Sequence, residues 1–578
     1  MFGRLIRFAL AYKTLFLTAA ICVLTLAFLS PFRPYLIGRM VDQYIVQEQN
    51  QELLLKWSVG IAFLLLLEGF LQFSSSYFSN LLAQSVIRDI RKKLFKHIVS
   101  FRMKYFDKTP VGALVTRVVS DLEAITQVFS SGIMEISGDL ISLTMVLSLM
   151  FATNWQLSLM TLIPIPLLII ATKVFAKAMR SSFQLERLQV TKLNTFVQEH
   201  LTGMSIVQIF NKNKEEYAKF VEINKGHRKA HINAVWANSI FFPVVEILSS
   251  LSIAFLLVWG ALRVDGKTSV EIQAMYGQII AFTLWIYQLY RPIRQLADKF
   301  NVLQRGVVRA ERIFEILDHD SKRQEGGQLT KVNFNTDISF SGVSFAYKKG
   351  QDVLKGIDLE IKKGTTVAIV GSTGAGKSTI INILGRFYEH ERGEIRIGDV
   401  NIEDIKLSYL RKNIAVVLQD IFLFSDSIYN NITLGDDTIS MEQVVAASKA
   451  VGAHQFISKL PGGYHYSIGE RGSVLSVGQR QLLSFIRAYV YNPQVLILDE
   501  ATSSVDNESE ALIQNATEHI TKGRTSIVIA HRMSTIQKAN LIVVMDQGKI
   551  IESGTHRNLI LKDGKYKTLY EKQIFQPK

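Results

Sequence analysis

A glycine-rich segment between an apolar run and a helical pattern carries the strongest chemical signal in the sequence. It has the pattern G-x-x-x-x-G-K-S and follows residues 366–370, a run typical of a short buried strand. In such a loop, backbone N–H groups surround phosphate oxygens and the next helix adds the positive end of its dipole. We expect Lys377 to contact the β- and γ-phosphates and the Ser378 hydroxyl to bind Mg²⁺. The predicted nucleotide-binding residues are Gly371, Ser372, Thr373, Gly374, Ala375, Gly376, Lys377, Ser378 and Thr379.

Two acidic residues, Asp499 and Glu500, end a second apolar run that occupies residues 495–498. A carboxylate at the end of a buried strand is where a P-loop nucleotidase holds its metal ion beside the phosphates. We therefore expect Asp499 to hold Mg²⁺ directly or through water. Glu500 is the next residue and points to the opposite side, so it is the candidate that polarises the attacking water.

A second phosphate site is indicated by Leu-Ser-Val-Gly-Gln at residues 475–479, which precedes a helical pattern. Ser476 and Gly478 at a helix start offer a hydroxyl and free N–H groups to an anion. One domain with two separate halves of a phosphate clamp favours a dimer, in which each copy completes the other's site.

The first half of the 578-residue chain predicts a membrane domain. Six apolar segments each meet the ~20 mostly apolar residues of a membrane span, allowing for polar ends, at 14–38, 53–78, 132–152, 155–176, 239–263 and 273–293. Much of the net charge of +15 lies in the long connections after the second and fourth segments. Because basic connections stay in the cytoplasm, both termini and the phosphate site are expected there. This placement explains the charge without a nucleic-acid partner.

The predicted organisation is a transmembrane domain at 1–317, a polar linker at 318–337 and a nucleotide-binding domain at 338–578. The fold class is therefore a bundle of six transmembrane helices followed by an α/β P-loop domain. Turn-forming residues near Asp107 in the first long connection predict a tip that docks on the ATPase, or else a solvated surface. Glu68 and Glu246 lie inside apolar segments, so they are expected to meet a cationic substrate, a proton or a hydrogen-bonding partner.

These motifs, in this order, resemble the exporter branch of the ATP-binding cassette (ABC) transporters over nearly the whole chain. The resemblance implies ATP and Mg²⁺ as ligands and a half-transporter that works as a dimer. It implies that Tyr347 stacks on adenine, that Gln419 contacts Mg²⁺ and couples to the membrane domain, and that His531 contacts the γ-phosphate. It also implies that Ser476, Gly478, Gln479 and Asp506 act on the nucleotide bound by the partner chain.

One position departs from the usual L-S-G-G-Q signature of the family, because Val477 replaces its first glycine. This substitution favours a heterodimer in which a second half-transporter has a degenerate site. The alternative is a homodimer in which the substitution at position 477 is neutral. The expected function is ATP-driven export of hydrophobic or amphipathic compounds. A lipid flippase and an ATP-gated channel or regulatory protein remain alternatives. The architecture favours a bacterial chain in the cytoplasmic membrane, surrounded by membrane lipids.

Overall fold

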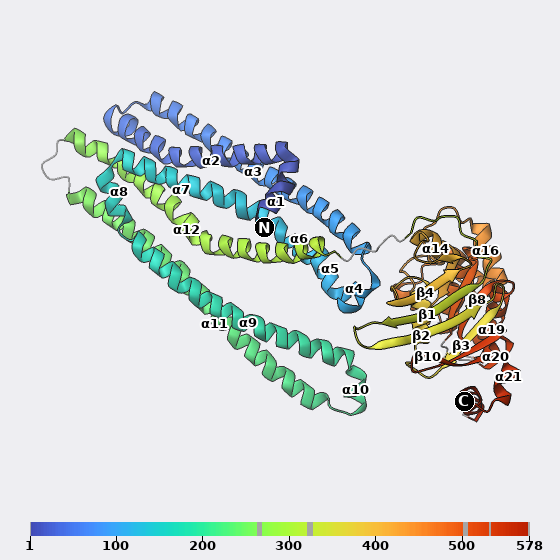
Figure 1. Ribbon diagram of the computed structural model, residues 1–578. Coiled ribbons are helices and arrows are strands. Elements are labelled where there is room, and N and C mark those ends of the chain that lie inside the picture. The colour runs from blue at the N-terminus through green and yellow to red at the C-terminus, as the bar shows by residue number, and fades with distance from the viewer. Residues whose placement is uncertain (1, 263–268, 321–326, 501–506, 531–532, 576–578) are drawn as a thin grey trace. The chain divides into compact units, whose positions relative to one another are not determined.

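The computed structural model describes residues 2–262, 269–320, 327–500, 507–530 and 533–575 (Figure 1). The chain divides into two compact units, which we treat separately. Unit 1 comprises Met1–Val99 and Thr109–Asp320, and unit 2 comprises Ser100–Lys108 and Ser321–Lys578. Residues 100–108, which belong to the first long connection, thus pack with the C-terminal part of the chain.

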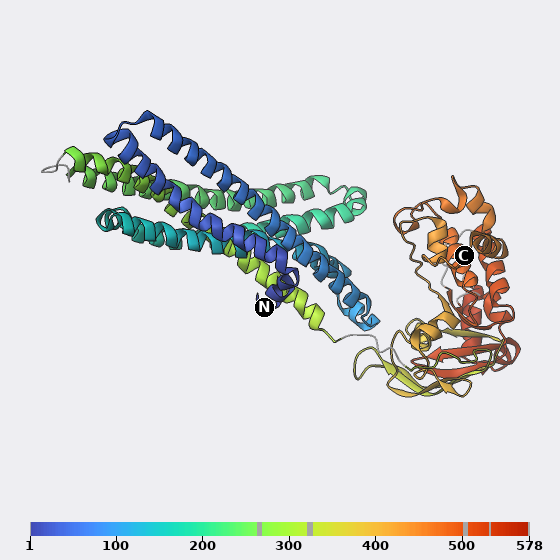
Figure 2. The ribbon, with the colours of Figure 1, turned by 90° about the horizontal axis from the view of Figure 1, so that it is seen from above.

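Unit 1 consists of long helices, and α2 lies beside α3 just as α9 lies beside α11 in both views (Figures 1 and 2). Among the described residues, five helical stretches are long and apolar enough to cross a membrane, namely Gly3–Gln47, Gln51–Val99, Val111–Thr153, Trp155–Thr202 and Asn213–Leu262. The sixth expected span, 273–293, lies within α12 (Ser269–Asp318), which is not among these five. The other helices are α1 (Phe2–Ala9), α2 (Lys13–Met40), α3 (Gln51–Val99), α5 (Val111–Thr116), α6 (Leu122–Gln127), α7 (Met134–Thr153), α8 (Trp155–Leu162), α9 (Ile165–Thr202), α10 (Met204–Ile209) and α11 (Asn213–Leu262).

Helix α2 contains Pro31 and Pro34, and α12 supplies a donor to one of the carbonyls that these prolines leave without a helical partner. A proline has no N–H, so Pro34 cannot donate to the carbonyl of Ser30 one turn earlier. Gln288 Nε2 donates to Ser30 O at 3.0 Å, and Trp285 Nε1 donates to Pro31 O at 2.8 Å. Side chains of α12 therefore saturate backbone carbonyls of α2.

Two histidine–glutamate contacts join α9 to α11 beyond their apolar segments. The ring of His200 contacts the carbonyl oxygen of Phe196 through Nδ1 at 2.8 Å and Glu216 Oε2 through Nε2 at 2.7 Å. His231 Nδ1 lies 2.6 Å from Glu186 Oε1. Both ring nitrogens of His200 therefore have a partner, one on its own helix and one on α11.

The described residues of unit 2 form two sheets. The larger has the strand order β10-β9-β3-β8-β7-β6, in which β10 is antiparallel to β9 and the other neighbours are parallel. Its strands are β3 (Thr366–Gly371), β6 (Ile414–Val417), β7 (Val495–Glu500), β8 (Thr525–Ala530), β9 (Leu541–Asp546) and β10 (Lys549–Gly554). The smaller sheet, of order β2-β1-β4-β5, consists of β1 (Ile338–Ala346), β2 (Asp352–Ile361), β4 (Arg392–Ile397) and β5 (Val400–Asn401).

The larger sheet separates two hydrophobic cores, because alternate residues of a strand point to opposite faces. One core lies between the sheets, and the other holds the helices α15 (Ile428–Thr433), α16 (Met441–Ala450), α18 (Val477–Val490) and α19 (Asn507–Thr521). Residues of the first core include Val367, Ile369, Val495, Ile497, Ile527 and Ile529. Residues of the second include Ala368, Val370, Leu496, Leu498, Val528 and Ala530. The remaining helices of unit 2 are α4 (Met103–Lys108), α13 (Lys377–Leu384), α14 (Leu407–Asn413), α17 (His454–Ser458), α20 (Met533–Lys538), α21 (His556–Leu561) and α22 (Lys565–Phe575).

Candidate nucleotide-binding site

The phosphate loop runs from the end of β3 to the start of α13, and the structure requires glycine at two of its positions. Gly376 has φ +99°, and a Cβ there would lie 2.8 Å from Leu354 Cδ2. At Gly371 a Cβ would lie 2.2 Å from the carbonyl oxygen of Met545 on the adjacent strand β9. Any larger residue at either position would deform the loop.

The loop has unused donors where phosphates would bind. In the described part of the chain, the backbone N–H groups of Thr373, Gly374 and Gly376 donate to no protein acceptor. The Lys377 ammonium is turned onto the loop itself, donating to Gly371 O at 2.9 Å and Ser372 O at 3.0 Å. Burial lowers the pKa of Lys377, and the charge of Asp499 opposes that shift. A ligand with phosphate oxygens would satisfy these donors, so the loop fits a nucleotide.

Ser378 and Asp499 lie side by side, as a shared metal ligand set requires. Ser378 Oγ donates to Asp499 Oδ2 at 3.2 Å, which joins the start of α13 to the end of β7. No group of three or more His, Cys, Asp or Glu that could hold a metal ion occurs among the described residues. Two protein oxygens fit Mg²⁺, which usually takes its other ligands from phosphates and water.

The other predicted catalytic residues follow parallel strands whose carboxyl ends share one edge of the larger sheet. Gln419 is exposed and lies two residues after β6, the neighbour of β7. Glu500 is the last residue of β7, but its side chain lies outside the described part of the chain. Asp506 and His531 also lie outside the described residues, although His531 directly follows β8 in the sequence. The strand order therefore brings the phosphate loop, Asp499 and Gln419 to one edge.

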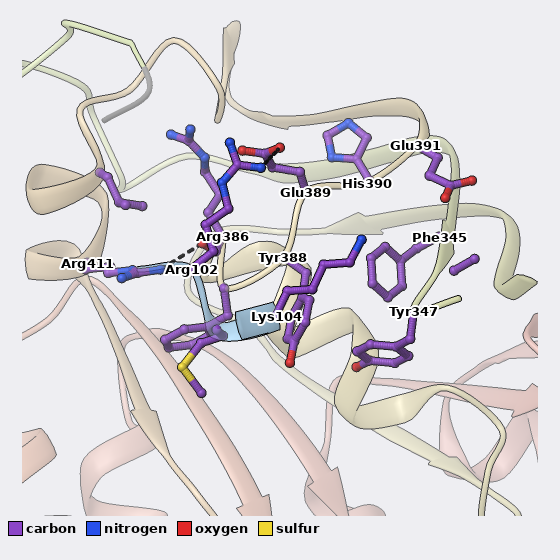
Figure 3. A pocket seen from close by; sticks show the side chains of 14 residues that line it. Arg102, Lys104, Phe345, Tyr347, Arg386, Tyr388, Glu389, His390, Glu391 and Arg411 are labelled. Atoms are coloured by element: carbon purple, nitrogen blue, oxygen red, sulfur yellow. Dashed lines mark hydrogen bonds and ion pairs between the residues drawn. The ribbon is translucent and has the colours of Figure 1, made fainter. Parts of the chain in front are cut away.

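Tyr347 lies beside the phosphate-loop helix and within an aromatic cluster (Figure 3). Its hydroxyl lies 3.4 Å from Thr379 Oγ1 and accepts a hydrogen bond from Asn382 Nδ2 at 3.2 Å. The ring meets Phe345 and Tyr388 edge to face, at centroid distances of 4.8 and 5.0 Å. With 36% of its surface exposed, Tyr347 has room to stack on a planar base.

Residues of the first long connection line a pocket of about 270 Å³ beside this cluster (Figure 3). Tyr388 donates a hydrogen bond to Asp107 of α4, and Arg102 Nη1 lies 3.3 Å from Glu389 Oε2. Burial, together with the Asp107 carboxylate, raises the pKa of Tyr388 well above its ordinary value. The prediction of a docking tip near Asp107 is thereby confirmed. Tyr388 is the link between this tip and Tyr347.

The signature segment has the geometry of an anion-binding helix start but stands apart from the phosphate loop. Ser476 caps α18: Gln479 N donates to Ser476 Oγ at 3.2 Å, and Ser476 N donates to Gln479 Oε1 at 3.0 Å. Gly478 is buried, whereas Val477 is 44% exposed. In the described part of the chain, no hydrogen bond or ion pair joins this segment to the phosphate loop. The valine thus leaves the cap intact.

Comparisons with known proteins agree with this geometry. Residues 16–293 match the family described as the ABC transporter transmembrane region, and residues 354–503 match the family described as ABC transporter. An uncharacterized ABC transporter ATP-binding protein of Bacillus subtilis is 36% identical over 541 residues, which cover 93% of this chain and 89% of that protein. The chain belongs to the ABC transporter family.

Two further relatives of this ABC transporter have names that state an activity. An ATP-dependent lipid A-core flippase of Syntrophus aciditrophicus is 33% identical over 582 residues, covering 100% of this chain and 95% of that protein. A Bacillus subtilis protein named as a probable multidrug resistance ABC transporter ATP-binding/permease protein is 33% identical over 555 residues, covering 94% and 80%. Both domains lie on one chain, so it is an exporter-type half-transporter that binds nucleotide and couples ATP hydrolysis to transport. Unit 1 contains its membrane helices.

Sequence reasoning missed two residues that hold the site in place. Ser372 Oγ donates to Asp546 Oδ1 at 3.2 Å, and Asn382 holds the hydroxyl of Tyr347. Asp546 ends β9, so an acid after an apolar run was the signal that could have found it. Asn382 sits in the first helical turns after the loop, and nothing in its local sequence distinguishes it.

Proposed function

We propose that this chain is one half of a dimeric ABC exporter that moves hydrophobic or amphipathic compounds out across the cytoplasmic membrane of a bacterium. The observation that carries the proposal is the open donor set of the phosphate loop on the same chain as the apolar helices of unit 1. Relatives named as flippases and as a multidrug resistance transporter support an amphipathic substrate. A lipid flippase is the second candidate.

In this proposal the membrane domain has six spans and both chain ends lie in the cytoplasm. The five apolar helices of unit 1 support the first five spans, and α12 supplies the sixth. The basic connections after the second and fourth spans support a cytoplasmic position for unit 2.

Each residue of the site then has a distinct role in binding. Tyr347 stacks on adenine, while the loop from Gly371 to Thr379 wraps the phosphates with its free N–H groups. Lys377 leaves the carbonyls of Gly371 and Ser372 and turns to the β- and γ-phosphates. Ser378 and Asp499, with Gln419, hold Mg²⁺, which offsets phosphate charge when bound.

Hydrolysis depends on placing water in line with the bond that breaks. Glu500 orients and polarises the water that attacks the γ-phosphorus, and the oxygen bridging the β- and γ-phosphorus atoms departs with the bond electrons. His531 stabilises the charge that develops on the γ-phosphate. Gln419 and the tip at Asp107 transmit the state of the site to the membrane helices, which alternate between inward and outward access.

The partner chain completes the site. Ser476, Gly478, Gln479 and Asp506 of each chain contact the nucleotide bound by the other, which fits the lack of a hydrogen bond or ion pair between the signature segment and its own phosphate loop in the described residues. The exposed Val477, where the family usually has glycine, supports a heterodimer with a second half-transporter over a homodimer. Membrane lipids surround the spans, and no nucleic acid takes part.

The test is ATP hydrolysis by the purified chain in lipid nanodiscs, beside Glu500→Gln and the exposed control Glu571→Gln. Turnover that disappears only in Glu500→Gln supports the site and a homodimer. A folded but inactive chain that becomes active with a second half-transporter supports the heterodimer. Turnover that survives Glu500→Gln contradicts the assignment of Glu500. In proteoliposomes, ATP-driven movement of a fluorescent phospholipid rather than a hydrophobic dye would favour the flippase.

A further inference from the structure

Two opposite charges meet among the apolar helices of unit 1. Arg33 on α2 and Glu68 on α3 lie 3.1 Å apart, measured from Nη1 to Oε2, where these helices run side by side (Figures 1 and 2). Their side chains are 29% and 12% exposed. Ionisable side chains within membrane-spanning helices often lie in a functional site beside their partners. From the sequence, Glu68 was expected to meet a cationic substrate, a proton or a hydrogen-bonding partner. In the structure it pairs with a cation of the protein itself, Arg33.

The pair leaves most of its hydrogen-bonding capacity unused. A guanidinium has five N–H donors, yet in the described part of the chain the contact with Glu68 is the only polar contact of Arg33. Glu68 Oε1 is buried and has no hydrogen-bond partner. A pair that served only to hold α2 against α3 would gain from saturating these groups, since an unmatched buried polar atom destabilises the fold. Because Arg33 is partly exposed, the buried Oε1 of Glu68 is the atom that indicates a further partner.

The exposures and the chemistry of the two groups favour an anion as this partner. Arg33 is the more exposed partner, so a molecule in the membrane reaches the guanidinium before the carboxylate. The planar guanidinium matches phosphate or carboxylate oxygens in pairs. The free Oε1 of Glu68 needs a donor, which a hydroxyl next to the acidic group would supply.

The position of Arg33 along α2 suits the head group of a membrane amphiphile. Arg33 follows Lys13, the first residue of α2, by 20 residues. This is a rise of about 30 Å, close to the thickness of the hydrocarbon layer. If Lys13 lies at the cytoplasmic surface, as in the proposed topology, Arg33 lies at the level of the outer head groups.

An apolar crevice lies between α2 and α7, close to this level. It begins at Phe28, which is five residues before Arg33 and therefore about 7.5 Å deeper in the membrane. Its volume is about 290 Å³. Five residues turn an α-helix by about 140°, so this crevice opens on another side of α2 from the ion pair with α3. Its lining residues are Phe28, Leu140, Ile141, Thr144, Met145 and Ser148.

We propose that Arg33 and Glu68 form a head-group site for an amphipathic anion that carries hydroxyl groups. The inference rests on the proposed export function and names the class of substrate. Arg33 binds the acidic group and Glu68 accepts from the hydroxyl. In the empty site Glu68 is the counter-ion that keeps the guanidinium at the helix surface.

The probe is phosphatidylglycerol, which combines a phosphate with a glycerol head. The full-length protein is placed in phosphatidylcholine nanodiscs that contain increasing fractions of phosphatidylglycerol, without ATP. Native mass spectrometry then counts the phosphatidylglycerol molecules that the protein retains. Arg33→Gln should weaken retention at least about tenfold, because it removes charge-assisted hydrogen bonds to the anion. The matched control is Arg39→Gln, an exposed arginine of the same helix, which should retain the lipid as the wild type does. Inorganic phosphate should not compete, since it lacks the apolar chain, and equal competition would overturn the proposal of an amphipathic ligand.

The charge-reversed double variant, Arg33→Glu with Glu68→Arg, separates binding from structure. It keeps an ion pair but buries the cation at position 68, so we expect near wild-type thermal stability with lost phosphatidylglycerol retention. Retention restored along with stability would show a merely structural pair and overturn the proposal. Binding of tetraphenylphosphonium that depends on Glu68 but not Arg33 would do the same. Because retention is measured without ATP, a failure of the proposed ATPase leaves this result interpretable.

Discussion

Replacing Lys377 by methionine tests the idea that this side chain has two sets of partners. Without nucleotide, its ammonium donates to the carbonyls of Gly371 and Ser372 at 2.9 and 3.0 Å and is only 8% exposed. With nucleotide, it should turn to the phosphates. Methionine keeps most of the volume and removes the charge. The variant should therefore change the nucleotide-free protein as well as the bound form.

The expected magnitude follows from these two contacts. A hydrogen bond from a charged donor contributes about 1.5–3 kcal/mol, and two bonds from one group do not add fully. Burial of the ammonium, which lowers the pKa of Lys377, offsets part of this gain. We expect unit 2 without nucleotide to lose about 2 kcal/mol, which lowers its unfolding midpoint by about 4–8 °C.

The assay is thermal unfolding of the full chain with and without ATP, beside Lys522→Met as an exposed control. The wild type should gain about 2.7 kcal/mol at an ATP concentration of about 100 times its Kd, whereas Lys377→Met should gain little. The control should follow the wild type. An unchanged midpoint for nucleotide-free Lys377→Met would refute the resting contacts, and an undiminished shift with ATP would refute the phosphate contact.

Two further changes test other parts of the chain. Gly376→Ala should lower nucleotide affinity at least about tenfold, because an alanine in the left-handed conformation costs about 1–2 kcal/mol and its methyl group would press on Leu354. Titration with a fluorescent ATP analogue measures the affinity, and an unchanged affinity would contradict the prediction. Lys219 and His200 hold the pKa of Glu216 below its usual range. Ionised Glu216 therefore stabilises the α9–α11 pair fully at pH values above the ordinary pKa of a glutamate, about 4.3. This stabilisation disappears as the pH falls through the lowered pKa of Glu216. The difference in unfolding midpoint between wild type and Glu216→Gln should therefore be constant near pH 7 and narrow below about pH 4.3, whereas a difference that widens on acidification would contradict this sign.

Much of the site could be predicted because its residues are close together in sequence. The loop from Gly371 to Thr379 needs a strand before it and a helix after it, and local patterns indicate both. The contact of Ser378 with Asp499 follows from a general property of such domains, in which the strand ending in acids lies near the loop. The fold class and the membership of the ABC transporter family were accessible for the same reason.

Contacts between distant segments could not be predicted. The pairing of Arg33 with Glu68 depends on how far α2 is shifted along α3. A hydropathy pattern does not determine this shift. The packing of residues 100–108 with unit 2 depends on Tyr388, an ordinary aromatic residue in its local sequence. The roles of Glu500 and His531 stay predictions, because their side chains lie outside the described residues.

The prolines of α2 have a mechanical consequence for transport. The carbonyls of Ser30 and Pro31 accept from Gln288 and Trp285 of α12, and a carbonyl without a partner in hydrocarbon costs several kcal/mol. Drawing α2 away from α12 would leave the carbonyl of Ser30 without a donor, because Pro34 has no N–H, whereas the carbonyl of Pro31 has the N–H of Tyr35 one turn later. Helices α2 and α12 should therefore move together as a rigid body during transport. The interface that opens to the outside must then lie between other helices.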